Sequence, residues 1–428
     1  MQLPAFLQRW NAIKCGIISI CIFLTGLGFF GMIAPMLFKK MVKGQLNLLP
    51  KSQLRPLYVK VPFFLDFRIY VFNLTNPDEV TKGGKPKVQE VGPYFFEEWK
   101  EKFDLVDNDE EDTLKYHYKN TFIFRPDLSG DGLTGNEIIT MPHPLITTMF
   151  MTLNVDKKPM IPMTATAIDA IFHNPKDMFW TGRVMDVLFD GIPIDCSTAD
   201  ETMAAKAVCG VFSSGAVAAV QPHNDTFFKF SLFQAGNATD LGEFTVFRGK
   251  KNSPDIGKVV AFNDEPEMDY WEGDECNQYT GTDSTIFPPY MDVNDGIIAY
   301  EPSICRSLIG TTGTPMNAAK RLQFNLEMVP IEDVPYLADI QEMYYPLFWI
   351  EEGAALGKEY VNQVKNTVLL AIKIQKMLKW LGIICGILGI ILSGIIFSAK
   401  MGKEQAAKTN LPSPVNNIDV KAIEKSLT

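Results

Sequence analysis

The segment Lys320-Arg-Leu-Gln-Phe-Asn-Leu-Glu-Met-Val329 alternates polar and apolar side chains over its whole length. In an extended chain, Leu322, Phe324 and Leu326 lie on one face and the polar side chains lie on the other. This pattern predicts a sheet with one buried face. Similar segments, separated by Gly, Asn, Asp and Pro, are Arg68–Phe72, Tyr116–Phe124, Thr226–Phe233, Phe244–Arg248 and Lys258–Phe262.

Between Pro142 and Gly191 the apolar residues recur at spacings of three and four instead of two. That spacing is typical of amphipathic helices. We expect about three short helices here, at His143–Leu153, Met160–Phe172 and Met178–Phe189. Many strands with one helical island indicate the α+β class.

The helical island allows two interpretations. In the first, its apolar stripes form a small core and its charged side chains are simply solvated, as is usual beside amphipathic helices. In the second, flexible thioethers contact an elongated apolar ligand while cations bind its carboxylate or ester head. The candidate ligand-binding residues of the second interpretation are Lys157, Lys158, His173, Lys176, Arg183, Met160, Met163 and Phe172.

Two long apolar runs lie near the ends of the chain, Cys15–Phe38 with 24 uncharged residues and Trp380–Ala399 with 20. Each can cross a hydrocarbon core of about 30 Å. A cleaved signal peptide is the alternative for the first run, but its apolar stretch is longer than the usual ~7–15 residues. We expect a tail at 1–14, a membrane span at 15–38, an ectodomain at 39–379 with a helical apex at about 142–191, a second span at 380–399 and a tail at 400–428.

Both tails are basic, because residues 1–14 carry two basic and no acidic side chains and residues 400–428 carry five Lys against three acidic side chains. Positive charge marks the cytoplasmic side of a membrane protein. We therefore expect both termini in the cytoplasm and the protein in the plasma membrane. The whole chain has a formal net charge of −10, which argues against nucleic acid as a partner.

Four of the seven cysteines lie between the spans, an even number that suits two disulfides in an oxidising compartment. They are Cys196, Cys209, Cys276 and Cys305. Three glycosylation sequons, beginning at Asn73, Asn224 and Asn237, lie in the same region. Both features are compatible with an ectodomain.

The motifs of catalysis and metal binding are missing from the sequence, which has four His and no His-Glu-x-x-His, Gly-x-Ser-x-Gly or Cys-x-x-Cys. The triplet Gly26, Gly28 and Gly31 has the spacing of a dinucleotide fingerprint, but it lies inside a span. Six acidic side chains from Asp104 to Thr113 indicate a solvated turn. We expect no enzyme activity, no catalytic residue, no metal and no cofactor.

A series of motifs runs through the chain in order. They are Asp66–Val80, Gly92-Pro-Tyr94, Glu97–Lys102, Leu133-Thr-Gly135, Met141–Leu145, Arg248-Gly249, Gly281–Pro289, Ile304–Ser307, Gly313-Thr-Pro315 and Arg321–Asn325. With these motifs the chain resembles the class B scavenger receptor family, and within it the sensory neuron membrane proteins of insects. The resemblance covers nearly the whole chain, including both spans.

The resemblance implies an antiparallel β-barrel-like core with a helical bundle at its membrane-distal apex and a lipid-conducting tunnel. For the sensory members it implies a receptor or co-receptor that passes fatty-acid-derived odorants or pheromones to the membrane or to an odorant receptor complex in the same membrane. Soluble odorant-binding proteins are further partners implied in this way. The pair Cys196 and Cys209 resembles a disulfide of the sensory branch.

The chain departs from the family between Ser307 and Gly313, where family members carry several dozen further residues that include cysteines. The resemblance implies that Cys276 and Cys305 pair with cysteines of that segment in the family, so both lose their partners here. Two outcomes remain open, a bond between these two cysteines or two free thiols. The chain would be a splice form or the product of an incomplete gene model.

Two other functions share this layout. A two-span channel subunit has the same hairpin topology, but its spans normally carry pore-lining polar residues, and those of this chain contain few. A scavenger or trafficking receptor for lipid or protein cargo uses the same fold. The charge of the apex and the pattern of expression would distinguish that receptor from a sensory one.

Overall fold

The computed structural model describes residues 5–269, 271, 273–288, 296–302, 308–310, 317–355 and 357–409. These residues belong to two compact units. We call the first the helical unit, with the residues up to Val42 and from Lys358 onward, and the second the strand unit, Lys43–Gly357.

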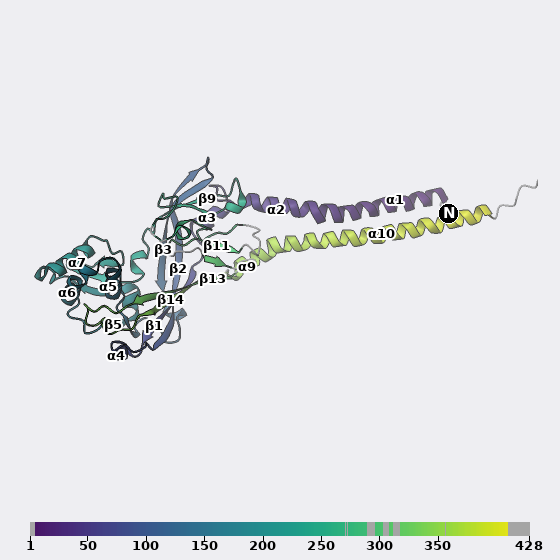
Figure 1. The fold of residues 1–428 in the computed structure, drawn as a ribbon. Coiled ribbons are helices and arrows are strands. Elements are labelled where there is room, and N and C mark those ends of the chain that lie inside the picture. Colours follow the sequence, from purple (N-terminus) through teal and green to yellow (C-terminus); the bar gives the residue numbers. More distant parts are fainter. Residues whose placement is uncertain are drawn as a thin grey trace, which may run out of the picture. The chain divides into compact units, whose positions relative to one another are not determined.

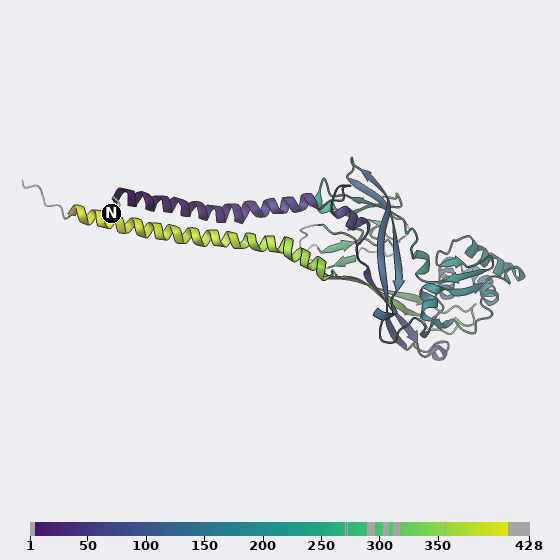
Figure 2. The same ribbon diagram turned by 180° about the vertical axis from the view of Figure 1, so that it is seen from behind.

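The helical unit consists of two long helices, which Figures 1 and 2 show side by side. The first contains α1 (Ala5–Leu24), the π-helical η1 (Thr25–Ile33) and the start of α2 (Ala34–Gln45). The second contains α9 (Lys358–Val364), the π-helical η8 (Lys365–Leu369) and α10 (Leu370–Thr409). Asn11–Gln45 and Lys358–Ala406 are each long and apolar enough to cross a membrane, and the spans expected at 15–38 and 380–399 lie within them.

The two long helices approach each other at glycines. A Cβ atom on Gly26 would lie 2.9 Å from the Cα atom of Gly382, and one on Gly386 would lie 2.7 Å from the Cα atom of Phe23. The Ser393 hydroxyl also donates a hydrogen bond of 2.7 Å to the carbonyl of Ala12. Small residues allow this close backbone approach, which is how membrane helices gain packing energy.

The strand unit is built on a curled, fully antiparallel sheet in the order β10-β9-β3-β2-β1-β14-β13. Its strands are β1 (Leu65–Leu74), β2 (Val88–Asn108), β3 (Thr113–Phe124), β9 (Glu243–Phe247), β10 (Val259–Phe262), β13 (Asn317–Met328) and β14 (Met343–Ala355). The strand predicted from Lys320 is confirmed as β13. The α+β fold class is also confirmed.

Smaller elements complete the strand unit. β4 (Ile138–Pro142) pairs with β5 (Phe179–Arg183), and β8 (Phe227–Phe230) lies between β6 (Ile192–Asp195) and β7 (Val220–Pro222). β11 (Ile297–Ala299) pairs with β12 (Leu308–Gly310). Three short helices are α3 (Leu54–Val59), α4 (Pro77–Val80) and α8 (Asp274–Asn277).

Two of the three helices expected in the island are present, as α5 (Pro144–Asp156) and α6 (Ile161–Ile171). The third prediction, a helix at Met178–Phe189, is wrong, because its β-prone start pairs with β4 as β5 and the rest forms a π-helical turn, η4 (Asp186–Asp190). The third helix of the group is α7 (Met203–Ser213), which the Cys196–Cys209 disulfide ties to the end of β6. Figure 1 shows α5, α6 and α7 together at one end of the strand unit, and we call this group the helical lobe.

The acidic run at Asp104–Thr113 is more than a solvated turn, because it surrounds a buried cation. Arg248 follows β9, and its side chain is 1% exposed. Its guanidinium donates to Asp107 at 3.1 Å, to Asp109 at 2.7 Å and to Asp112 at 3.3 Å. The cluster joins the β2–β3 hairpin to the chain after β9.

Candidate functional site

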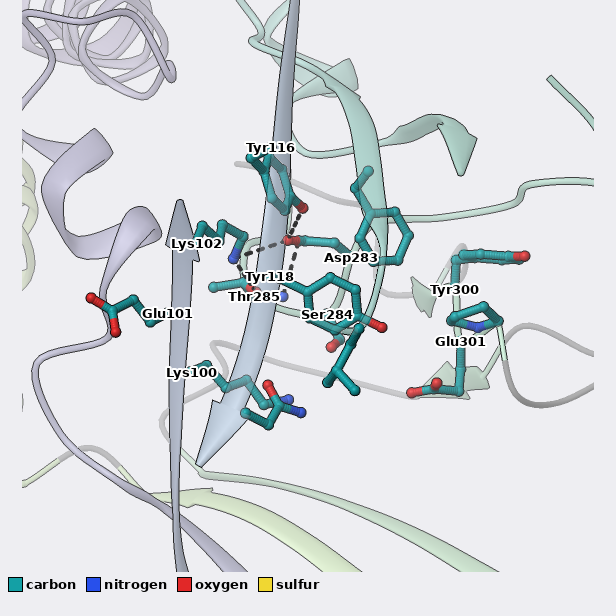
Figure 3. A pocket seen from close by; sticks show the side chains of 14 residues that line it. Lys100, Glu101, Lys102, Tyr116, Tyr118, Asp283, Ser284, Thr285, Tyr300 and Glu301 are labelled. Carbon is teal, nitrogen blue, oxygen red and sulfur yellow. Dashed lines mark hydrogen bonds and ion pairs between the residues drawn. The ribbon is translucent and has the colours of Figure 1, made fainter. Parts of the chain in front are cut away.

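A cavity of about 420 Å³ lies inside the strand unit, within the range of small-molecule sites. Figure 3 shows the side chains that line it. They are Lys100, Glu101, Lys102, Tyr116, Tyr118, Asn120, Leu241, Phe244, Asp283, Ser284, Thr285, Tyr300, Glu301 and Pro302.

Neighbouring residues of β2 and β3 form one wall of this cavity. Lys100 lies opposite Asn120 in the register of the sheet, and Lys102 lies opposite Tyr118. Residues two positions apart on a strand share a face, so these two cross-strand pairs point to the same side. The segments 283–285 and 300–302 contribute other parts of the lining.

Lys102 and Asp283 form a buried ion pair, with 3.1 Å between Nζ and Oδ2 and side chains that are 5% and 3% exposed. The Lys102 ammonium also donates to Thr285 Oγ1 at 2.8 Å and to the carbonyl of Tyr58 at 3.2 Å. The hydroxyls of Tyr58 and Tyr116 donate to the same Asp283 oxygen, at 2.8 and 2.6 Å. Figure 3 shows the bond from Tyr116. The pair is therefore fully hydrogen-bonded.

The pKa values in this cluster follow from burial and from the ion pair. Burial alone would raise the pKa of Asp283, but Lys102 and the two tyrosine hydroxyls hold it below its usual value. Burial lowers the pKa of Lys102, and Asp283 opposes that effect. Burial and the charge of Asp283 raise the phenol pKa values of Tyr58 and Tyr116, so both phenols remain protonated donors.

A second charged network begins at Lys100, which pairs with Glu352 of β14 and lies 3.5 Å from Glu98. Lys320 of β13 contacts the same Glu352 at 2.8 Å and Glu301 at 3.2 Å. The second oxygen of Glu98 has no hydrogen-bond partner within the described part of the chain. Burial, followed by the charge of Glu352, raises the pKa of Glu98 to about 7 even though Lys100 opposes the shift.

We expect the substitution Glu98→Gln to stabilise the protein at alkaline pH. Because the folded-state pKa of Glu98 lies above its usual value of 4.5, the wild-type free energy of unfolding falls as pH rises toward and through about 7. The neutral glutamine side chain of the variant lacks this titration. The difference between the urea midpoints of variant and wild type should therefore grow from pH 5.5 to pH 8.5.

The matched control is Glu101→Gln on the same strand. Hydrogen bonds from Lys119 and Lys60 outweigh the effect of burial and hold the pKa of Glu101 below its usual value. Replacing Glu101 should leave the pH dependence of the urea midpoint between pH 5.5 and pH 8.5 the same in shape as that of wild type. Parallel profiles for Glu98→Gln and wild type would contradict the role assigned to Glu98.

The predicted ligand-binding residues lie away from this cavity. Lys157, Lys158 and Lys176 are exposed and form no ion pair among the residues that the structure describes. His173 is 68% exposed, and its Nε2 lies 3.4 Å from Oδ2 of Asp195. The guanidinium of Arg183 forms ion pairs with Asp186 and Asp190.

The three apolar residues of that prediction differ in exposure. Met163 and Phe172 pack against the main hydrophobic core, and Phe172 meets the ring of His143 edge to face at 5.1 Å between centroids. Met160 is 39% exposed. The ligand-binding role of the whole set stays a prediction.

Sequence reasoning missed the charged residues of the cavity. A signal was present, because Glu98, Lys100 and Lys102 alternate along one strand and continue the face of buried Phe96. That pattern places three charges on the inner side of a sheet. The partners Asp283, Glu352 and Lys320 are distant in sequence, and only the fold brings them together.

The described residues also place the sequons and one of the two uncertain cysteines. Asn224 is exposed in the turn between β7 and β8, whereas the side-chain oxygens of Asn73 and Asn237 accept hydrogen bonds from the backbone N–H groups of Thr140 and Phe122. Cys276 takes part in a disulfide, which excludes the free-thiol outcome for it. Cys305 lies outside the described residues.

Comparison with known proteins gives consistent matches over most of the chain. The model of the CD36 family matches residues 16–310 and 309–397. Sensory neuron membrane protein 1 of Anopheles gambiae is 38% identical over 510 aligned positions, covering 96% of this chain and 92% of the relative. The proteins of the same name from Aedes aegypti and Manduca sexta are 41% and 34% identical, covering 82% and 91% of this chain and 81% and 91% of the relatives.

These matches also bear on the predicted missing segment. The alignment with the Anopheles protein is longer than the 428 residues of this chain, so the relative carries residues that this chain lacks. The two stretches matched by the family model meet at residues 309–310. That position lies between Ser307 and Gly313, where the gap was expected.

Proposed function

Because the chain belongs to the CD36 family and is a membrane receptor of that type, we propose that it captures lipidic ligands, fatty-acid-derived odorants or pheromones among them. In this proposal residues 39–379 form the extracellular ectodomain, residues 15–38 and 380–399 span the plasma membrane, and both termini are cytoplasmic. Captured ligand passes through a tunnel in the ectodomain to the membrane or to an odorant receptor complex beside it.

The observation that carries the proposal is the cavity of about 420 Å³ inside the strand unit. Its lining combines aromatic rings and aliphatic carbon with hydrogen-bonding groups. Such a mixture suits an amphipathic molecule, because apolar surface supplies binding energy and a few polar groups fix orientation. Lipidic odorants have that character.

We expect affinity to rise with the length of the alkyl chain until the cavity is filled. Each buried CH₂ group contributes about 0.8 kcal/mol, which is about fourfold in affinity. Binding of a homologous series to the full-length chain in lipid nanodiscs measures this slope, with empty nanodiscs correcting for partition into lipid.

A cavity-filling variant sharpens that experiment. Leu241→Trp places a larger side chain in the cavity lining and should abolish the dependence on chain length. Leu128→Trp, at a side chain that is 45% exposed, is the control and should bind like wild type. Equal affinity for short and long chains in the wild-type protein would contradict the proposal.

The helical lobe is the proposed capture surface for ligand or for a soluble odorant-binding protein that carries it. The double charge reversal Lys157→Glu with Lys158→Glu should slow capture most at low salt, because exposed charges act over about 10 Å at 0.1 M ionic strength. The same double change at Lys82 and Lys85, which are exposed and lie outside the lobe, is the control. Capture rates that match wild type at every ionic strength would leave these lysines as solvated side chains.

A second candidate function is a receptor for protein cargo, and the surface of α7 favours it. Met203 is 88% exposed and Val211, eight residues later on the same helix, is 47% exposed. A contiguous patch of exposed apolar side chains is typical of protein-binding surfaces. Met203→Lys with Val211→Lys should weaken uptake of protein cargo while sparing the binding of free lipid.

A further inference from the structure

The two edges of the seven-stranded sheet differ in how open they are. β10, at one edge, has four residues, and the N–H group of Val259 on it donates a hydrogen bond of 3.0 Å to the carbonyl of Gly281. β13, at the other edge, has twelve residues and no proline. Among the described residues the backbone of β13 forms hydrogen bonds only with β14. The side of β13 that faces away from β14 is therefore a row of unpaired N–H and C=O groups.

The apolar face of β13 is also incompletely covered. Leu322 and Phe324 pack against the main hydrophobic core but are only partly buried, whereas Leu326 on the same face is 9% exposed. Phe324 stacks on Phe348 of β14, with 4.7 Å between ring centroids. A further strand beside β13 would cover Leu322 and Phe324 from the edge of the sheet.

The sequence of β13 is complementary to itself when a second copy runs antiparallel to it. In a pair of such strands centred on Phe324, each residue lies opposite the residue that is equally far on the other side of Phe324. The opposed pairs are then Arg321 with Glu327, Leu322 with Leu326, Gln323 with Asn325, and Phe324 with its own copy. Opposite charges, apolar side chains and amides therefore all meet suitable partners, each on its own face of the joined sheet.

Neighbouring registers lose this complementarity. Moving the centre of the pair to Gln323 places Arg321 opposite Asn325, and moving it to Asn325 places Glu327 opposite Gln323. Neither register pairs the two opposite charges. The side-chain pattern therefore favours the register centred on Phe324.

The charged side chains of β13 that this register pairs are accessible. Arg321 contacts Glu351 of β14, but it is 67% exposed, and its guanidinium has further N–H groups for a second carboxylate. Glu327 is exposed and accepts a hydrogen bond of 3.1 Å from the hydroxyl of Tyr344. Within the part of the chain that the structure describes, Glu327 has no cation as a partner.

We propose that the open edge of β13 binds the β13 edge of a second copy of this chain, antiparallel and centred on Phe324, so that the two sheets become continuous. The contact is isologous, and its two-fold symmetry repeats the pair of Arg321 and Glu327 on both sides of Phe324. The inference goes beyond the proposed function and does not depend on it, because the contact requires no ligand.

The mass of the full-length chain in detergent, measured by light scattering after size-exclusion chromatography over a concentration series, tests the proposal. We expect a dimer that dissociates on dilution. Glu327→Arg places arginines opposite each other in both symmetric pairs and should weaken the dimer by about tenfold or more. Arg321→Glu places glutamates opposite each other and should have a similar effect.

Mixing the two charge variants provides the rescue. In a mixed dimer of Glu327→Arg with Arg321→Glu, each arginine lies opposite a glutamate again, so the equimolar mixture should dimerise more tightly than either variant alone. Glu332→Arg, at an exposed side chain shortly after β13, is the matched control and should leave the wild-type dimer unchanged.

Cysteine substitution tests the register independently, in a chain whose Cys15, Cys21 and Cys385 are replaced by serine. In the proposed register Gln323→Cys of one copy lies directly opposite Asn325→Cys of another, with Cα atoms about 4.5–5.5 Å apart, a distance that suits a disulfide. Two copies of the same variant place their cysteines diagonally and farther apart. Oxidation of the mixed variants should therefore give more linked dimer on a non-reducing gel than oxidation of either variant alone.

Three results would overturn the proposal. The first is a monomer at every concentration. The second is a dimer that both charge variants preserve at wild-type strength, which would place the contact elsewhere on the molecule. The third is equal disulfide linkage with and without mixing of the two cysteine variants, which would exclude the register centred on Phe324.

Discussion

Replacing Arg248 with methionine should lower the free energy of unfolding by about 3–5 kcal/mol, the usual cost of breaking a buried ion pair by removing one partner. Arg248 is 1% exposed and forms ion pairs with three aspartates. Of these, Asp112 is itself 4% exposed and would stay buried without its cation. A loss of this size is a large part of a typical stability of about 5–15 kcal/mol.

Urea unfolding of the full-length chain in detergent, followed by tryptophan fluorescence, measures this loss. The control is Arg321→Met, because Arg321 also pairs with a carboxylate but is 67% exposed, and exposed pairs contribute little. The free energy of unfolding of Arg248→Lys should lie between those of Arg248→Met and Arg321→Met. A lysine keeps the positive charge but lacks the planar guanidinium that contacts several carboxylates at once. An Arg248→Met variant as stable as Arg321→Met would contradict the structural role of the cluster.

Replacing Gly26 with leucine should separate the two long helices of the helical unit. The new Cβ atom would lie 2.9 Å from backbone atoms of Gly382, closer than real Cβ contacts, and neither backbone can yield without moving a helix. The contacts at Gly386 and Ser393 depend on the same approach. Gly28→Leu is the matched control, because a Cβ atom at Gly28 meets no atom within 4 Å.

A disulfide reporter makes this prediction measurable. A Cβ atom on Gly16 would lie 3.7 Å from the Cβ atom of Ser393, a separation that suits a disulfide. The reporter carries Gly16→Cys and Ser393→Cys in a chain whose Cys15, Cys21 and Cys385 are replaced by serine. Oxidation should form a disulfide that links the two helices. After protease cleavage of the chain between the helices, a non-reducing gel shows whether the two fragments remain joined. Gly26→Leu should abolish the link and Gly28→Leu should keep it; equal linkage in both would show that the helices do not meet at Gly26.

The parts of the fold that sequence reasoning predicted are those with a local period. β13 followed from the alternation at Leu322, Phe324 and Leu326, and α5 and α6 followed from helical spacing. The segment at Met178–Phe189 has the same apolar spacing, but pairing with β4 supplied its backbone with partners that the sequence does not show. Helix α7 lay outside the predicted island altogether.

The candidate site was harder to predict, because its geometry joins distant residues. Lys102 and Asp283 are 181 positions apart in the sequence, and neither residue by itself is distinguishable there from an ordinary surface charge. Burial and pairing appear only when the sheet brings β2 next to the segment at 283–285. The five cations of the predicted ligand-binding set were easier to notice since they are close in sequence, although none of them lines the cavity.

The interior position of β1 in the sheet delays the pairing of one of its edges during synthesis. One edge of β1 pairs with β2, which follows it closely, but its other edge pairs with β14, and the ion pair between Arg68 and Glu351 joins residues 283 positions apart. A ribosome adds about 5–20 residues each second, so that edge stays unpaired for roughly 15–55 s while the rest of the chain is made. An unpaired strand edge is a template for wrong pairing. Chaperones that cover extended segments should therefore bind nascent chains that end before Met343 more strongly than chains that extend beyond Ala355.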